Sequence, residues 1–246
     1  MVSVDLRAEA AGLFRAEHLF TAAPLFPKAE VLRFLGKGRV GQTSRKTSRR
    51  VNAWIKNLSH LIKPRLIYCI GQVADVTRTA VCLRNGAVIK SPKIAKSFQD
   101  CRTVVCFAAT LGKEIDHQIE QLNGENRIVD AFIVDALGSV AAEQLVNSFH
   151  MEMEHRCIEQ GRGATLRFSP GYCDWPLTGQ NFVFKLLPTH KIGLRLTESF
   201  LMMPSKSVSG VFGVTRRPVS ATRSHNPCHI CQKLDCTVRR DRVASI

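Results

Sequence analysis

Apolar residues recur along this chain with two spacings, and the spacing separates helices from strands. From Ser44 to Leu61 they return every three or four positions, which places Val51, Trp54 and Leu58 on one face of a helix. Proline and glycine mark where such segments stop. The helices predicted in this way cover residues 44–61, 92–99, 112–122, 126–159 and 179–187. Within residues 1–30 the pattern predicts a weak amphipathic helix followed by a loop around Pro24 and Pro27.

Shorter runs rich in branched and aromatic residues are typical of strands. A turn at Arg84-Asn85-Gly86 between two of these runs predicts a hairpin, and we expect the two most C-terminal runs to form a strand pair. Helices and strands do not alternate strictly, which favours an α+β fold. The predicted strands cover residues 66–73, 79–83, 87–89, 102–112, 192–204 and 207–215.

The longest predicted helix has a middle built from small residues, "DALGSVAAEQL" from Asp135 to Leu145. Small side chains let a neighbouring element approach the helix axis. Gly161 and Gly163 then end the helix. We therefore expect another element to pack closely against this part of the helix.

The composition is that of a globular protein rather than a membrane protein. The chain has 246 residues, of which 45% are hydrophobic and 22% charged, as in ordinary globular proteins. No apolar run reaches the roughly 18–20 residues that a membrane-spanning helix needs, and the first residues do not resemble a secretory signal. We expect a cytoplasmic protein without a membrane segment.

Charge points to acidic partners. The chain carries 35 Lys and Arg against 20 Asp and Glu, a net charge of +15, and seven of the basic residues lie between Arg33 and Arg50. This segment is either a solvated basic surface or a docking site for an acidic protein. Because no nucleic-acid-binding module and no interleaved aromatic residues accompany the charge, we expect no nucleic-acid partner.

Three of the nine cysteines are clustered near the C-terminus with C-x2-C-x4-C spacing. Close spacing of this kind can present several thiolates to one metal ion. Zinc could take these cysteines with His225 or His229, an iron–sulfur cluster could use them with another ligand, or two could form a redox pair; an incidental tail is the remaining interpretation. The candidate metal ligands are Cys228, Cys231 and Cys236.

The segment "LRFSPGYCDWPL", from Leu166 to Leu177, suggests a ligand-holding loop. Arg167 supplies a planar donor fork suited to a carboxylate or phosphate. Pro170 fixes the backbone, Gly171 permits close approach, and Tyr172 offers a ring face and a hydroxyl. The alternative is that Arg167 pairs with a structural acid and Tyr172 belongs to the core.

Two motifs together resemble the activation (reactivation) domain of cobalamin-dependent methionine synthase. The first is R-x-x-P-G-Y at 167–172, and the second is L-T-E-S-x-x-M-x-P-x-x-S-V-S-G at 196–210. The resemblance implies a C-shaped single α+β domain with a long twisted antiparallel sheet flanked by helices. With the local pattern, it divides the chain into an N-terminal extension (1–40), an activation-domain-like domain (41–217) and a basic, cysteine-rich tail (218–246).

The resemblance also implies the ligand S-adenosylmethionine. Arg167 would grip its methionine carboxylate, backbone groups of the loop would meet the adenosyl portion, and the segment 203–207 would lie near the corrin of cobalamin on a neighbouring protein. Glu198 would brace the sheet or loop. The implied ligand-contacting residues are Arg167, Ser169, Pro170, Gly171, Tyr172, Met203, Pro204, Ser205, Lys206 and Ser207.

The implied function is that of a reactivation factor, a methyltransferase-type component that supports reductive methylation of cobalamin. The chain lacks the D-x-H-x-x-G motif that usually anchors a corrinoid, so the cobalamin is expected on a partner, a corrinoid methyltransferase such as a methionine synthase lacking its own activation domain. An acidic flavodoxin- or ferredoxin-like protein would supply the electron. The alternative function is a non-catalytic, metal-binding interaction or redox-sensing protein on the same fold.

Overall fold

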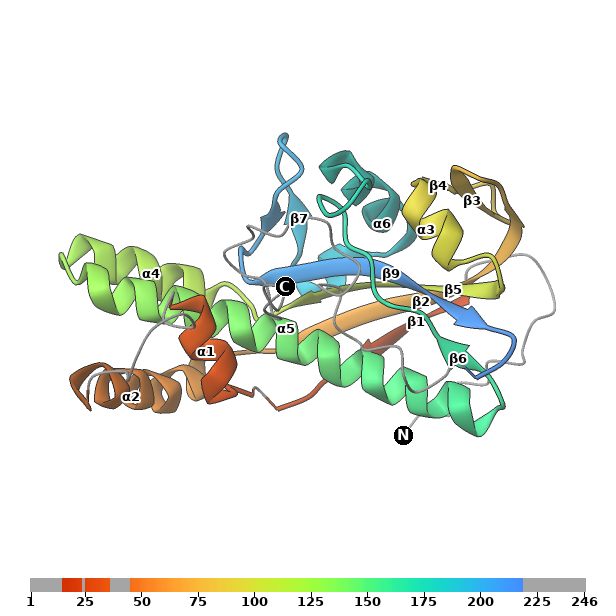
Figure 1. Ribbon diagram of the computed structural model, residues 1–246. Helices are drawn as coiled ribbons and strands as arrows, with labels where there is room; N and C mark the ends of the chain where they lie inside the picture. Colours follow the sequence, from red (N-terminus) through yellow and green to blue (C-terminus); the bar gives the residue numbers. More distant parts are fainter. Residues whose placement is uncertain (1–14, 24, 36–44, 219–246) are drawn as a thin grey trace, which may run out of the picture.

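A seven-stranded antiparallel sheet with helices on both faces forms the centre of the molecule (Figure 1). The computed structural model describes residues 15–23, 25–35 and 45–218. This architecture confirms the predicted α+β class. The strands of the sheet are β1 (Arg15–Phe20), β2 (Arg65–Val76), β3 (Ala80–Leu83), β4 (Val88–Lys90), β5 (Cys101–Thr110), β6 (Gly163–Ala164) and β9 (Ser207–Thr215).

The long strand β2 organises the sheet. β5 pairs along one of its edges, while β1 and β3 pair with opposite ends of the other edge. β9 and then β6 continue the sheet beyond β5, and β4 closes the predicted hairpin with β3. The main path therefore runs β4-β3-β2-β5-β9-β6.

Strand β5 is buried on both faces, which explains its almost uninterrupted apolar sequence. Successive side chains of a strand point to opposite faces. Val105, Phe107 and Ala109 accordingly join one core cluster, and the residues between them join a second cluster on the other face of the sheet.

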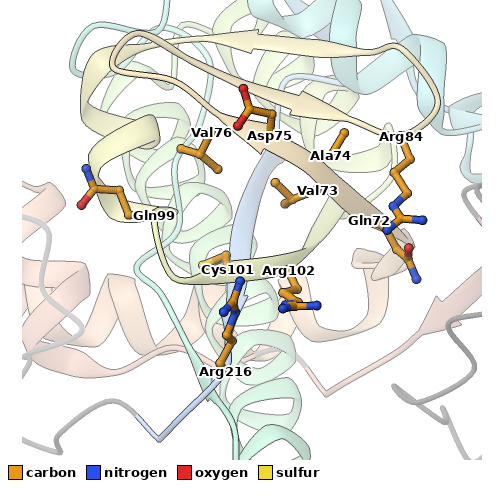
Figure 2. Close-up of a pocket in the computed structure, with 10 residues that line it drawn as sticks. All are labelled: Gln72, Val73, Ala74, Asp75, Val76, Arg84, Gln99, Cys101, Arg102 and Arg216. Carbon is orange, nitrogen blue, oxygen red and sulfur yellow. The ribbon is translucent and has the colours of Figure 1, made fainter.

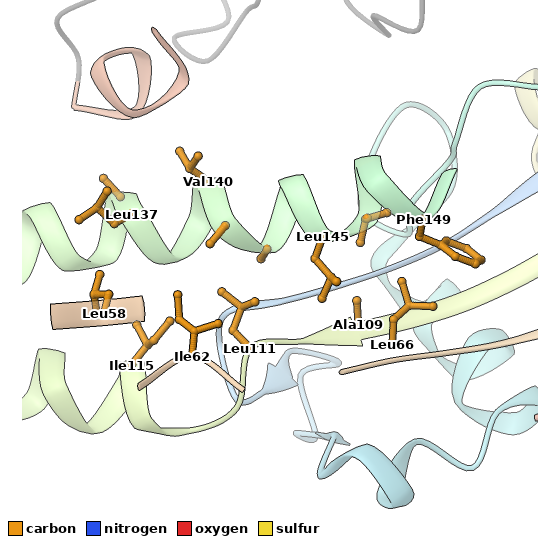
Figure 3. Close-up of a cluster of buried hydrophobic side chains, with 14 of the residues drawn as sticks. Leu58, Ile62, Leu66, Ala109, Leu111, Ile115, Leu137, Val140, Leu145 and Phe149 are labelled. Carbon is orange, nitrogen blue, oxygen red and sulfur yellow. The ribbon is translucent and has the colours of Figure 1, made fainter. Parts of the chain in front are cut away.

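The first cluster lies between the sheet and a layer of helices that includes the 32-residue helix α5 (Ile128–Glu159) (Figure 3). The other helices of this layer are α1 (Lys28–Phe34), α2 (Arg45–Leu61) and α4 (Glu114–Gly124). The opposite face is covered by α3 (Pro92–Ser97), α6 (Gln180–Leu186) and the short 3₁₀ turns η1 (Leu177–Gly179) and η2 (Thr189–Ile192).

The small-residue middle of α5 does admit a close neighbour, as its sequence predicts. A Cβ atom at Gly138 would lie 3.0 Å from the Cγ of Lys206 and 3.1 Å from a methyl group of Ile115. The absence of a side chain at Gly138 thus lets the segment before β9 and the start of α4 pack against α5.

A buried carboxylate ties α2 to the start of α5. Asp130 accepts hydrogen bonds from Trp54 Nε1 at 3.0 Å and from Arg50 Nε and Nη2, both at 3.0 Å. Arg127 Nε adds a further bond at 3.2 Å. Burial alone would raise the pKa of Asp130, but these hydrogen bonds outweigh it and hold the pKa below its ordinary value.

Two predictions about elements were wrong. The helix predicted before the loop around Pro24 and Pro27 is wrong over its described part, which forms strand β1, and α1 begins after that loop, at Lys28. Residues 192–204 do not pair with β9; they begin at the last residue of η2 and contain a separate hairpin of β7 (Arg195–Leu196) and β8 (Met202–Met203).

Residues 15–35 are integrated with the rest of the domain. β1 pairs with β2, and Val31 of α1 is fully buried in the first core cluster. The described part of the predicted N-terminal extension therefore contributes to the sheet and the core. In the described ranges, no helix has the length and apolar character needed to cross a membrane.

Candidate functional site

The segment that leads into the R-x-x-P-G-Y loop runs antiparallel to β9. β6 pairs with the end of β9, Thr165 N donates to Gly213 O, and Phe168 exchanges two backbone hydrogen bonds with Val211 at 2.9 and 2.8 Å. This pairing gives the segment strand-like alternation. The ring of Phe168 packs into the second core cluster, next to Phe98.

Arg167 directs its guanidinium toward α5. Its Nη2 donates to Asn147 Oδ1 at 2.6 Å and lies 3.7 Å from Glu143 Oε2. The Arg167 side chain is 17% exposed and that of Glu143 33% exposed. An acid, an amide and a guanidinium thus meet at a partly open position. Glu143 and Asn147, four residues apart on α5, were not singled out from the sequence.

The two sequence motifs meet at Gly210. A Cβ atom there would lie 2.4 Å from the carbonyl oxygen of Phe168 and 3.1 Å from the Oγ of Ser169. Glycine is required because the loop crosses β9 at this point without room for a methyl group. Gly210, the last residue of the second motif, therefore lets the first motif pack against β9.

The Pro-Gly-Tyr turn is held by its own backbone and by a buried tryptophan. Gly171, at φ 90°, donates its N–H to Trp175 O, and Trp175 N donates to Tyr172 O. Trp175 is 4% exposed, so it anchors the loop, whereas Tyr172 is 70% exposed. The hypothesis that Tyr172 belongs to the core is wrong.

Asp174 fastens the far side of the loop to α3. Its carboxylate accepts a hydrogen bond from the hydroxyl of Ser91, which caps α3, and another from Lys93 N at 2.9 Å. The loop is thus fixed at β9, at Trp175 and at α3. Tyr172 and the exposed Cys173 lie between these attachment points.

The second motif forms the β7–β8 hairpin and the segment that enters β9. Thr197 closes the hairpin turn through its backbone and hydroxyl. Glu198 is exposed in this turn and makes no hydrogen bond or ion pair with the residues that the structure describes, so the expectation that it braces the sheet was wrong. Ser209 reaches inward and donates to Gln180 of α6 at 2.7 Å.

The segment 203–207 is fastened to the helices by its polar groups. Ser205 donates to Asp116 of α4 through both its N–H and its hydroxyl. Lys206 is buried, and its Nζ lies 2.6 Å from Asp135 Oδ1 and 3.2 Å from Ser139 Oγ. Ser207 Oγ donates to Pro204 O at 2.7 Å. Met203 and Pro204 are half-buried at the surface of the segment.

The proposed metal ligands Cys228, Cys231 and Cys236 lie outside the described residues. Within the described ranges, no group of three or more His, Cys, Asp or Glu side chains could hold a metal ion. Cys106 in the core is not a reactive thiol: burial raises its pKa well above the ordinary value, as does a hydrogen bond with Cys69 across the β2–β5 pair.

Comparison with known proteins agrees with both motifs and fold. The family model described as "Vitamin B12 dependent methionine synthase, activation domain" matches residues 89–218, more than half of the chain. A crystal structure of the MetH reactivation domain bound to AdoHcy is similar at a TM-score of 0.59 and 19% sequence identity. The match covers 91% of this chain and 86% of that one. The chain belongs to the family of activation domains of vitamin B12-dependent methionine synthase.

Proposed function

We propose that this protein binds S-adenosylmethionine and supports the reductive methylation of cobalamin on a separate corrinoid methyltransferase. A methionine synthase lacking its own activation domain is the first candidate partner. Family membership supports this role, and the related crystal structure contains AdoHcy, the product left when S-adenosylmethionine gives up its methyl group. In this chain the proposal rests on the meeting of the two motifs at Gly210, beside the loop that carries Arg167.

The methionine portion of the ligand carries a carboxylate and an ammonium group. The guanidinium of Arg167 and the carboxylate of Glu143, 3.7 Å apart, offer the complementary charges. In our proposal Arg167 binds the carboxylate and Glu143 accepts hydrogen bonds from the ammonium group. Asn147 orients Arg167 through their hydrogen bond.

The adenosyl portion would lie on the Pro-Gly-Tyr turn. The N–H groups of Gly171 and Tyr172 already donate within the loop, to Trp175 O and Ser169 O. The adenosyl group would therefore meet carbonyl oxygens and the exposed ring of Tyr172, whose face suits stacking. Pro170 and Gly171 set the shape of this surface.

An acidic flavodoxin- or ferredoxin-like protein would supply one electron, which reduces cob(II)alamin on the partner to cob(I)alamin. S-adenosylmethionine would then supply the methyl group: its S–CH3 bond breaks as the bond from the methyl group to cobalt forms, and the sulfonium becomes a neutral thioether. No proton moves in the transfer, so this chain needs no general base. Its contribution would be to hold the methyl donor in line with the corrin. Met203 and Pro204 would face the corrin, while Ser205, Lys206 and Ser207 keep their segment in shape.

Calorimetry with S-adenosylmethionine tests the binding step. We expect Arg167→Ala to weaken binding by roughly 2–5 kcal/mol, the cost of removing one partner of a hydrogen-bonded charge pair. Arg156→Ala is the matched control, because Arg156 also bonds to an acid of α5, Glu152, at 2.9 Å. Equal affinity in wild type and Arg167→Ala, or no binding by either, would contradict the ligand assignment.

A reactivation assay tests the second step. A methionine synthase without its own activation domain, with its cobalamin oxidised, is mixed with this protein, S-adenosylmethionine and a reducing system. We expect activity to return with wild type and Arg156→Ala, and not with Arg167→Ala at ligand concentrations below the dissociation constant of that variant. If binding is normal but no activity returns, the ligand assignment stands and the partner assignment fails.

A further inference from the structure

The sheet divides at the ends of β2 and β5. These strands pair from Arg65 opposite Thr110 to Gln72 opposite Thr103 and then separate. Past this point β2 continues with β3 while β5 stays with β9. The division leaves a pocket of about 510 Å³, shown in Figure 2.

Each branch of the divided sheet carries a β-bulge next to the pocket. The register of β2 against β3 shifts between Val73 and Asp75, and that of β5 against β9 shifts between Cys101 and Thr103. The residues inside the two shifts, Ala74 and Arg102, both line the pocket. Bulges re-aim side chains and are frequent beside functional sites. The two bulges thus contribute residues to the wall of the pocket.

Three guanidinium groups line this pocket, from Arg84, Arg102 and Arg216 (Figure 2). All three side chains are exposed, and none forms an ion pair or a side-chain hydrogen bond with the residues that the structure describes. Asp75 is the one acid among the lining residues, and the same holds for its carboxylate. The lining therefore carries a net positive charge, and its three guanidinium groups can bond to a ligand without breaking an ion pair with a described residue.

Neutral groups complete the lining. Gln72 and Gln99 contribute amides that can both donate and accept hydrogen bonds. Burial, and secondarily the charge of Asp100, raises the pKa of the Cys101 thiol to about 12, so this cysteine adds no negative charge at neutral pH. The chemistry of the pocket suits binding of an anion and offers no nucleophile.

We propose that this pocket binds a small anion carrying two or more phosphate groups, of the size of a nucleoside diphosphate. One guanidinium group can donate two parallel hydrogen bonds to two oxygens of a phosphate. Three guanidinium groups are more than a single carboxylate needs as partners. The volume falls within the range of ligand pockets, roughly 300–1,000 Å³. The amides of Gln72 and Gln99 would meet the uncharged part of the ligand.

The pocket is separate from the Arg167 loop. Arg216 follows the end of β9, five residues beyond Val211, where the loop attaches, which corresponds to roughly 16 Å along an extended strand. S-adenosylmethionine carries no phosphate, so it is not the ligand expected here. The proposal therefore stands or falls independently of the proposed function.

Calorimetry with ADP and with pyrophosphate, at about 0.15 M salt, tests the site. We expect the double variant Arg102→Gln/Arg216→Gln to weaken binding about tenfold or more, since each of its two substitutions removes charge-assisted hydrogen bonds to the phosphates. The control is Arg65→Gln/Arg78→Gln, which removes the same charge from exposed arginines outside the pocket and should change affinity less than about twofold.

Asp75→Asn provides a variant that gains rather than loses affinity. Removing the one carboxylate of the lining should tighten ADP binding several-fold because a like charge beside the phosphates is gone. Thermal unfolding of each variant checks that it is folded. Equal binding of ADP and pyrophosphate supports recognition of the phosphate groups alone. Tighter binding of ADP supports recognition of the phosphate groups together with a contribution from the nucleoside.

Three results would overturn the proposal. The first is that the wild type binds neither ADP nor pyrophosphate at millimolar concentration, and the second is that sulfate binds as tightly as pyrophosphate. The third is that the control pair weakens binding as much as the pocket pair, because then only the overall positive charge of the protein attracts the anion.

Discussion

At the scale of single residues, Gly210 is the position where the smallest change has the largest expected effect. Gly210→Ala would place a methyl group 2.4 Å from the carbonyl oxygen of Phe168, and a backbone atom cannot move aside cheaply. We expect a loss of about 1–3 kcal/mol of unfolding free energy, as for other overpacked sites, together with loss of S-adenosylmethionine binding. Urea unfolding and calorimetry measure the two effects.

The matched control is Gly124→Ala at the end of α4, where an added Cβ meets nothing within 4 Å. Alanine is the better helix former, so this variant should be unchanged or more stable by roughly 0.4–1 kcal/mol. Equal stability of Gly210→Ala and wild type would mean that the loop can shift away from β9. The contact between the motifs would then not be a requirement of the fold.

Asp130 gives the fold a specific dependence on pH. Its folded pKa is below the ordinary value, so its stabilising contribution is complete above its unfolded pKa of about 4 and is lost as the pH falls through the folded value. Asp130→Asn should cost about 1.5–3 kcal/mol of unfolding free energy near pH 7, the range for hydrogen bonds to a charged group. The difference between wild type and variant should shrink from about pH 5 downward.

Denaturant unfolding of both proteins between pH 7 and about pH 3 measures that difference directly. Asparagine keeps an acceptor for Trp54 and removes the charge that pairs with Arg50 and Arg127. A difference that stays constant over this range would show that the charge of Asp130 contributes nothing to stability.

Local sequence identified one half of the candidate ligand site. Arg167 and Gly171 stand out because their residue types have narrow structural uses. Glu143 and Asn147 do not stand out in the middle of a long helix. Their only signal is a pair of polar residues at i and i+4 on a helix of which half of the residues are buried. Their meeting with Arg167 depends on how α5 lies on the sheet, which no local pattern contains.

At the scale of elements, the N-terminal end of α2 carries the four basic residues of the segment 33–50 whose side chains the structure describes. Arg45, Lys46 and Arg49 are exposed, whereas Arg50 bonds to Asp130. Charge reversal at the three exposed positions should slow reactivation about tenfold at low salt, because electrostatic steering of an acidic partner is lost. S-adenosylmethionine binding should be unchanged.

Reversal of Arg78, Lys90 and Lys96, three exposed basic residues at the β3–β4 end of the molecule, controls for the change in net charge. Reactivation rates at low and high salt, measured for both triple variants, separate a docking surface from a general effect. If the α2 variant reactivates normally, its basic residues form only a solvated face.

Elements with strong periodicity were predictable, and weak or short ones were not. The stripe of α2, the apolar run of β5 and the length of α5 each follow from local spacing. β7 and β8, of two residues each, have no periodicity that could distinguish a separate hairpin from an added strand. The strand β1 depends on its pairing with β2, about 50 residues away.

At the scale of the whole molecule, the cysteine cluster of the C-terminal tail predicts a metal site that a direct measurement can test. We expect protein purified without oxygen to carry either an iron–sulfur cluster, seen as visible absorbance and bound iron and sulfide, or one zinc ion. Cys228→Ser/Cys231→Ser should abolish metal binding. Cys173→Ser, which changes an exposed cysteine of the described loop, should not.

Metal-free wild-type protein with every thiol titratable would contradict the metal prediction and leave the cysteine cluster without an assigned role. Bound zinc would exclude the cluster as an electron carrier, because zinc has no redox chemistry. The reductant would then have to come from a partner alone.

The position of β9 determines when this protein can fold on the ribosome. β5 is apolar on both faces and pairs on one edge with residues about 100 positions later in the chain. At synthesis rates of roughly 5–20 residues per second, β5 waits about 5–20 seconds for that neighbour. During this interval an aggregation-prone edge is exposed in the nascent chain. Production of soluble protein should therefore depend on chaperones that shield β5, and on cool growth, more than the stability of the finished fold suggests.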